Sequence, residues 1–256
     1  MGKPLTDHRR NQARFATTRW SLVLAARTSS ADDAREALEA LCGIYWFPIY
    51  AYARRTGRSP DRARDLTQGF FTMVIERRSF DQARKERGRL RSFLLTSFRH
   101  FLSNEYDAAQ AQKRGGALPH LAFEFDDGEQ RYAREPVDTL TPEDVYERRW
   151  AAAVLAAASA RLDEKHRGGW MRDSRFFATL KQHVVDGNDT SSGALAERLG
   201  STAGTVRVLV HRIRQQFLVC LREVIADTVD GPAAIDGELQ HLRSVVSRAG
   251  TSFGDS

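Results

Sequence analysis

The chain has 256 residues, of which 41% are hydrophobic, so it can bury one large core or two small ones. A mean hydropathy of −0.48 and the absence of any run of about 20 apolar residues exclude a membrane-spanning segment. The net charge is +6, which by itself points only weakly to a polyanionic partner.

The charges alternate in blocks along the chain. Residues 81–114 carry eight basic and four acidic side chains, whereas residues 120–147 carry nine acids and two arginines. A second basic block follows, with five arginines and no acid between Arg198 and Arg222. Two basic blocks separated by an acidic connector predict two contact points on one nucleic acid.

The N-terminus has no apolar core, so we expect no secretory signal. Cys42 and Cys220 are far apart in sequence and each lies in an apolar helical context, which favours buried thiols over a disulfide. We therefore expect a cytoplasmic protein.

A first helix is expected after Thr17 or Thr18, and a second from about Ala31. Pro48 lies within this second helical pattern, where it either kinks the helix or starts a new one. Apolar residues continue to Gly57, which marks the end of the pattern.

Ser59-Pro60-Asp61 predicts a further helix start, with a capping serine and a proline in the first helical position. Leu66, Phe70 and Met73 form its expected inner stripe. Phe71 and Ile75 fall among polar residues on the other side, so this helix either presents a partner-binding face or is buried on both sides. The pattern alone leaves both interpretations open.

A basic loop, residues 84–91, precedes a helical segment rich in phenylalanine and ending near Tyr106. Interleaved aromatic and basic residues suit single-stranded DNA, because bases stack on rings while arginine holds phosphates. Most of Phe93, Phe98 and Phe101 are expected in the core, which makes the loop the better candidate for base contacts.

The acidic residues 115–141 show no sustained period and predict a linker, with a short extended piece at 121–125. Thr141-Pro142-Glu143-Asp144 is a strong helix start for a long alanine-rich helix. Another helix is expected over residues 175–185, and a short one from about Ala233 to Val246. Because no strand pattern of any length is present, we expect an all-α fold.

The stretch 190–222 reads as two helices joined by a tight turn. Ser191 or Ser192 can cap the first helix, Gly200 supplies a left-handed turn residue, and Ser201 or Thr202 caps the second. The second helix has an apolar stripe and, opposite to it, a face of small, polar and basic residues. Such a face can enter a major groove, which predicts a DNA-binding helix-turn-helix. The alternative is a helical hairpin with a solvated basic face.

Signs of catalysis are missing from the sequence. It contains no glycine-rich phosphate loop, no His-Glu-x-x-His and no paired cysteine motif. We therefore expect neither an enzyme nor a bound cofactor or metal.

Two motif blocks resemble bacterial RNA polymerase sigma factors of the extracytoplasmic-function (ECF) group. Asp65-Leu66-Thr67-Gln68-Gly69-Phe70-Phe71 resembles the DLTQ-x-F signature of region 2, and Leu90-Arg91-Ser92-Phe93-Leu94 its "frsWL" element, with Phe93 in place of tryptophan. Residues 195–200, 204–207 and 211–214 resemble region 4. The acidic linker and the tail 236–242 are similar to those of a long-linker subgroup common in planctomycetes.

The resemblance implies two helical domains, a region 2-like bundle (17–114) and a region 4-like helix-turn-helix domain (142–228). An acidic linker (115–141) would join them, and a C-terminal extension (229–256) would follow. It also implies a subunit that directs RNA polymerase core to promoters, binding the clamp of the largest subunit and reading the −10 and −35 elements. An anti-sigma factor is a further partner that the resemblance allows.

Three sets of site residues follow from the resemblance. The polymerase-binding residues would be Asp65, Gln68, Phe71, Thr72 and Ile75. Those at the −10 element would be Arg87, Arg89, Arg91, Ser92, Arg99, Asn104, Lys113 and Arg114. Those at the −35 element would be Ser201, Thr202, Thr205, Arg207, Val208, His211, Arg212 and Arg214.

The sequence departs from the family at three places. Region 2 usually ends in a dense arginine run, whereas residues 107–112 here are Asp-Ala-Ala-Gln-Ala-Gln. Leu209 stands where the family often has arginine, and Asn104 where it often has aspartate. Two alternatives therefore remain: a stand-alone helix-turn-helix regulator, which would dimerise to meet two half-sites, and a degenerate sigma-like module that binds protein without reading DNA.

Overall fold

The computed structural model describes residues 31–77, 89–111, 128–133, 140–171, 176–185, 187, 190–229 and 231–251. Their helices are α3 (Ala31–Arg55), α4 (Pro60–Arg77), α6 (Leu90–Ala111), α7 (Gly128–Tyr132), α8 (Pro142–Arg167), α9 (Phe177–Val185), α10 (Ser192–Leu199), α11 (Ala203–Ala226) and α12 (Pro232–Thr251). Within these ranges the extended backbone is limited to one isolated bridge, so the fold is all-α, as predicted. None of these helices is long and apolar enough to span a bilayer.

Several helix boundaries follow the local signals in the sequence. The Ser59 hydroxyl accepts a hydrogen bond from the backbone N–H of Arg62 (3.3 Å) at the start of α4. At the start of α8, Thr141 Oγ1 accepts from the Asp144 N–H, and Asp144 Oδ2 accepts from the Thr141 N–H. This reciprocal arrangement satisfies two backbone donors that the first helical turn leaves unpaired. Of the two roles weighed for Pro48, the start of a new helix is excluded, since α3 runs through it.

The chain divides into two compact units. Unit 1 comprises Met1–Ala153 and Ile225–Ser256, and unit 2 comprises Val154–Val224. The long helices α8 and α11 each have residues in both units. The four-part domain layout implied by the sigma factor resemblance stays a prediction, and the boundaries of these units fall at other points of the chain.

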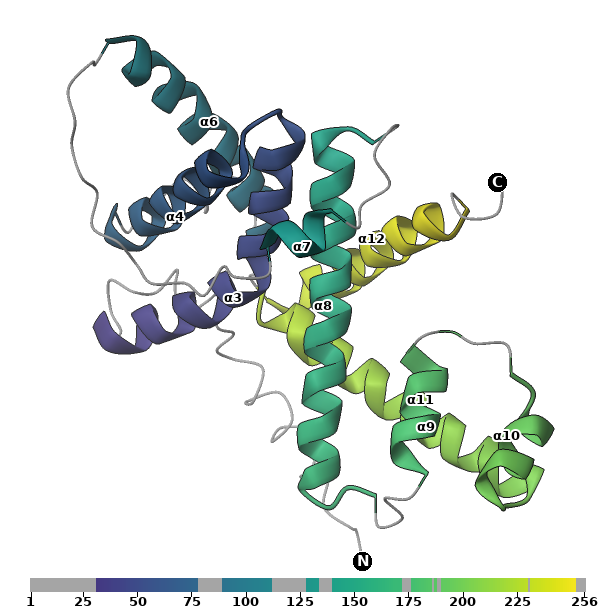
Figure 1. Cartoon of the computed structure of the whole chain (residues 1–256). Helices are drawn as coiled ribbons and strands as arrows, with labels where there is room; N and C mark the ends of the chain where they lie inside the picture. Colours follow the sequence, from purple (N-terminus) through teal and green to yellow (C-terminus); the bar gives the residue numbers. More distant parts are fainter. Residues whose placement is uncertain are drawn as a thin grey trace, which may run out of the picture. The chain divides into compact units, whose positions relative to one another are not determined.

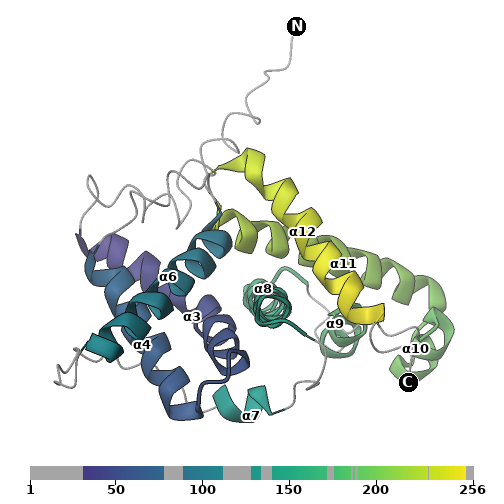
Figure 2. The same cartoon turned by 90° about the horizontal axis from the view of Figure 1, so that it is seen from above.

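The core of unit 1 is an aromatic cluster between three helices. Helix α3 contacts α4 and α6, and α4 also contacts α6; the three lie side by side in both views (Figures 1 and 2). The Phe70 ring lies 5.0 Å from the ring of Phe98 and 5.4 Å from that of Phe71, edge-on in both cases. Such edge-to-face pairs add about 0.5–1.5 kcal/mol to the apolar burial. The prediction that Phe93 and Phe98 belong to the core is confirmed.

Helix α7 lies within the stretch 115–141 that we expected to be a linker. It packs against α3 (Figure 2), where Glu129 accepts two hydrogen bonds from Arg54 (2.9 and 2.8 Å) and one from the Tyr50 hydroxyl (2.6 Å). Arg131 stacks over the Phe47 ring at 4.0 Å. Residues 128–133 are therefore a docked element of unit 1, which periodicity could not predict for so short a helix. The expected extended piece at 121–125 lies outside the described residues, as does the helix expected after Thr17 or Thr18.

Unit 2 contains the rest of α8, with α9, α10 and most of α11. Its buried side chains include Leu162 of α8, Leu180 of α9 and Leu195 of α10. Lys165 of α8 forms an ion pair with Glu223 of α11 (2.7 Å), and Lys181 of α9 pairs with Asp163 of α8 (2.6 Å). These ion pairs join α8 to α9 and to α11 within unit 2.

Candidate nucleic-acid interface

The turn between α10 and α11 has the geometry that the sequence predicts. The Ser191 hydroxyl accepts from the Ala194 N–H (3.2 Å) and caps α10. Gly200 follows α10 in the left-handed region, with φ 59° and ψ 40°. Thr202 then caps α11, its hydroxyl accepting from the Thr205 N–H at 3.2 Å. Of the two caps weighed for α11, Thr202 is the one whose hydroxyl bonds to the helix.

Helix α11 has one buried and one exposed face, and the expected face is the exposed one. Val206, Val210 and Ile213 are buried, and Phe217 is half-buried. On the other side Ser201 is half-buried and the rest are exposed: Thr202, Thr205, Arg207, Val208, His211, Arg212 and Arg214. All eight residues predicted for the −35 element therefore lie where a ligand can reach them.

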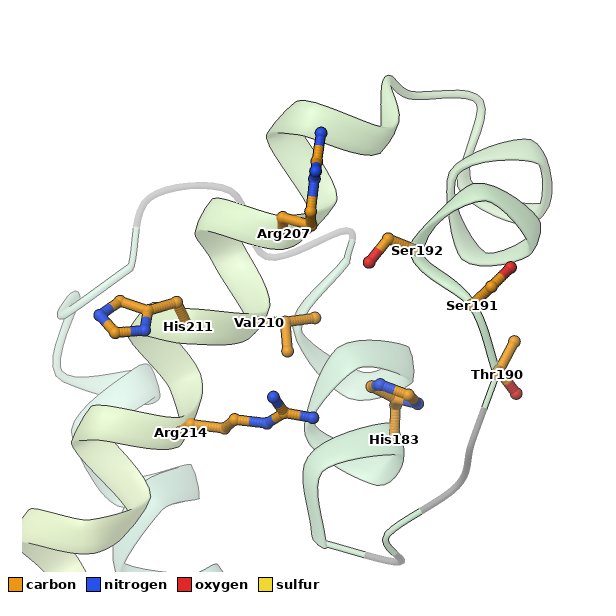
Figure 3. A pocket seen from close by; sticks show the side chains of 8 residues that line it. All are labelled: His183, Thr190, Ser191, Ser192, Arg207, Val210, His211 and Arg214. Carbon is orange, nitrogen blue, oxygen red and sulfur yellow. The ribbon is translucent and has the colours of Figure 1, made fainter.

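A hollow beside α11 brings three of these residues together with residues that the sequence did not single out. Arg207, His211 and Arg214 line it with Val210, and the other lining residues are His183, Thr190, Ser191 and Ser192. In Figure 3 the Arg214 guanidinium points toward α9, which carries His183. The Nδ1 atom of His183 is buried and has no hydrogen-bond partner.

The described residues that line this hollow include arginines and no acid. Within the described part of the chain Arg207, His211 and Arg214 form no ion pair. Arginine side chains bind phosphate oxygens, and so do serine side chains at the N-terminus of a helix. The arrangement can therefore hold the backbone of a nucleic acid next to the exposed face of α11.

The predicted polymerase-binding face of α4 needs correction. Phe71 has 0% exposed surface and Thr72 has 3%, so neither lies on an accessible face. The reason is that α4 packs against both α3 and α6, and the side that carries Phe71 and Thr72 is among the buried ones. Asp65 is exposed and Gln68 is half-buried. The side chain of Ile75 lies outside the described residues.

The predicted −10 residues in and just before α6 differ in how exposed their side chains are. Arg99 and Asn104 are exposed, and Ser92 and Arg89 are half-buried. Arg91 differs from the others, because only 8% of its side chain is exposed and it is paired with Glu238 of α12 (2.9 Å) and Glu147 of α8. Its guanidinium also lies 4.9 Å from the centre of the Trp150 ring. Arg87, Lys113 and Arg114 lie outside the described residues.

The acids that hold Arg91 were missed at the level of sequence. Glu238 falls in the apolar stripe of α12 with Ile235, Leu242 and Val245, all of them buried. A charged residue at a core position of an amphipathic helix is a signal that it has a partner. That signal was available in the sequence, but it does not say which cation is the partner.

Comparisons with known proteins were made by sequence and by structure. No family model, curated protein or solved structure matches the chain.

Proposed function

We propose that the chain is a sigma factor of the ECF type, a cytoplasmic subunit that directs RNA polymerase core to promoters. The observation that carries the proposal is the exposed face of α11, which contains no acidic residue. This helix follows α10 directly after the turn at Gly200. A helix presented in this way fits the major groove, with its N-terminal residues at the base edges. Thr205, Arg207 and Val208 lie in that N-terminal part, and His211, Arg212 and Arg214 follow.

The step from a DNA-binding helix pair to a sigma factor rests on the resemblance of its motifs. In their order along the chain, Asp65 to Phe71, Leu90 to Leu94 and the helix-turn-helix resemble regions 2 and 4 of the family. Asp65 and Gln68 are the residues of α4 that we assign to the polymerase clamp, because both are accessible. Arg99 and Asn104 are their counterparts for the −10 element on α6.

A stand-alone helix-turn-helix regulator is the second candidate, and one observation favours it. The buried Phe71 removes the apolar centre that we expected in the polymerase-binding face. Interfaces usually have such a centre, so a purely polar contact by Asp65 and Gln68 would be weaker. A regulator of this kind would bind duplex DNA by itself and would not need the polymerase.

Run-off transcription with bacterial core RNA polymerase on a promoter library distinguishes the two candidates. A sigma factor yields promoter-dependent transcripts and co-purifies with the core enzyme. The Arg207→Ala variant should lose transcripts from promoters with a −35 element while it still co-purifies. If the wild-type chain shifts duplex DNA but yields no transcript and no complex with core enzyme, the regulator is the correct assignment.

A further inference from the structure

The C-terminal helix α12 is tied to the start of α6 by a network of charges within unit 1. Glu238 has 1% exposed surface, and its Oε1 accepts a hydrogen bond from Arg91 Nε at 2.9 Å. Its other oxygen lies 3.5 Å from Arg89 Nε. Glu147 of α8 pairs with Arg91 and, through its second oxygen, with His241 of α12 (2.7 Å). One acid of α12 thus faces both arginines at the start of α6.

The backbone adds a second tie at the same place. The Leu90 N–H donates to the Thr228 carbonyl at 3.1 Å, and Arg89 and Val229 form an antiparallel bridge. The segment that leads from α11 into α12 therefore covers the main chain of residues 89 and 90. These are the residues that a bound strand would meet on entering α6.

A glycine inside α12 makes room for one of the arginines. A Cβ atom at Gly237 would lie 3.0 Å from Arg89 Nη2, a distance at which the guanidinium must shift by a few tenths of an ångström. Glycine in the interior of a helix is destabilising relative to alanine. Glycine at position 237 is thus unfavourable for the helix, but it leaves the space that the Arg89 guanidinium occupies.

One polar atom of this charge network has no hydrogen-bond partner, which affects how strongly the network holds α12 against the start of α6. Glu238 Oε2 is buried without a hydrogen-bond partner. Burial lowers the pKa of Arg91, but the hydrogen bond and charge of Glu238 and the charge of Glu147 outweigh it, so the pKa is raised and Arg91 stays charged. Buried ion pairs repay their desolvation only when every polar atom is satisfied. The docked state of α12 is accordingly one that a competing polyanion can displace.

We propose that α12 is a latch that withholds Arg89, Arg91 and the Leu90 N–H from single-stranded DNA. This proposal rests on the proposed function, because the sigma factor resemblance places Arg89 and Arg91 at the −10 element. In the closed state, Glu238 takes the place of a phosphate against both arginines. Opening releases Arg89 and the Leu90 N–H from their partners and leaves Arg91 with Glu147 as its acidic partner, and these groups together form a site for a sugar-phosphate backbone.

Two variants open the latch in different ways. Glu238→Gln removes the negative charge but keeps the side-chain size, and Glu147 still neutralises Arg91. Gly237→Ala displaces Arg89 without any change of charge and strengthens the helix, so it does not act by unfolding α12. The matched controls are Glu164→Gln, an exposed acid of unit 2, and Gly43→Ala, a helical glycine of α3 with open space around it.

The first measurement is binding of the full-length variants to a fluorescent single-stranded oligonucleotide of about 16 nucleotides, followed by anisotropy. A latch closed about nine-tenths of the time weakens apparent binding about tenfold, so both variants should bind up to about tenfold more tightly. One additional phosphate contact, made by Arg89, should also steepen the salt dependence by about 0.7 in log–log slope, because Glu147 still neutralises Arg91. The controls should behave as wild type in both respects.

The second measurement is hydrogen exchange at the Leu90 amide, which reports opening without any DNA. Both variants should exchange faster there than wild type. Faster exchange with unchanged or weaker strand binding would show that α12 is a structural brace, and the latch would be wrong. Unchanged exchange in Gly237→Ala would overturn it as well. Neither measurement contains polymerase, so a failure of run-off transcription concerns the proposed function alone.

Discussion

The sequence and the structure place Phe71 differently. Its polar sequence neighbours favour an exposed position, yet its ring lies in the core beside Phe70. Phe71→Ala should therefore destabilise the protein by about 3–5 kcal/mol, because it leaves a cavity. Urea unfolding of the variant checks this, with Asp65→Ala on the exposed side of α4 as control, which should cost less than about 0.5 kcal/mol. Equal midpoints for the two variants would contradict the burial of Phe71.

Arg207 is the residue for which base reading and phosphate binding can be separated. It is exposed on α11, and its Nε donates to the Ala203 carbonyl at 3.3 Å. If Arg207 reads a base, Arg207→Ala should reduce discrimination between −35 sequences by about 1–3 kcal/mol. If it holds phosphate, all sequences should weaken alike and the salt slope should fall by about 1. Duplex binding titrations at several salt concentrations measure both quantities.

The control for this prediction is Arg222→Ala, which removes the same charge from the same helix. Arg222 lies 15 residues further along α11, a rise of roughly 22 Å. It should leave duplex binding nearly unchanged. If both variants lose the same affinity, binding depends on net charge and α11 has no reading face.

At the scale of elements, the turn between α10 and α11 depends on backbone conformation at one position. Gly200 has φ 59°, and a Cβ placed on it would meet nothing within 4 Å. Gly200→Ala should therefore destabilise unit 2 by about 1–2 kcal/mol through backbone strain alone. Gly204→Ala, in the exposed first turn of α11, should be neutral or stabilising by up to about 1 kcal/mol. Urea unfolding checks the pair, and the same sign for both would contradict the left-handed turn.

The docking of α7 on α3 should depend on pH through Glu129. Hydrogen bonds from Arg54 and Tyr50 hold the pKa of Glu129 below the usual 4.5, despite partial desolvation. A lowered pKa in the folded state contributes stability above the unfolded pKa, and this stability is lost as the pH falls through the folded value. Glu129→Gln should thus be less stable than wild type at about pH 7, and the difference should shrink toward zero below about pH 4.

Urea unfolding of both proteins across this pH range tests the dependence on Glu129. Glu164→Gln removes an exposed acid of unit 2 and should show no such convergence. A stability difference that stays constant with pH would show that the Glu129 carboxylate does not hold α7.

At the scale of the whole molecule, the C-terminal part of the chain determines what the start of α6 can do. Arg91 and Glu238 are 147 positions apart, and both are buried in the same unit. Glu238→Ala should therefore destabilise the protein, because Arg91 keeps only the half-buried Glu147 as its acidic partner. The loss should reach about 1.4 kcal/mol, at which the open state of α12 becomes the folded state. Thermal unfolding measures this, and a loss as small as that of the exposed Asp236→Ala would contradict it.

The sequence by itself determined the features that depend on near neighbours. The caps at Ser59, Thr141, Ser191 and Thr202, the turn at Gly200 and the exposed face of α11 all follow from residues within one or two helical turns. Helical periodicity and capping hydrogen bonds are local, so the order of residues suffices to predict them.

Only the tertiary structure decided which polar and aromatic residues are accessible. It buried Phe71 between helices of unit 1, docked α7 onto α3 and paired Arg91 with two acids far away in sequence. Each of these depends on contacts between elements, which periodicity does not encode, since an amphipathic pattern identifies a buried face without naming what covers it. For that reason the −35 residues kept the positions expected from the sequence, while Arg91 of the −10 set and Phe71 and Thr72 of the polymerase set did not.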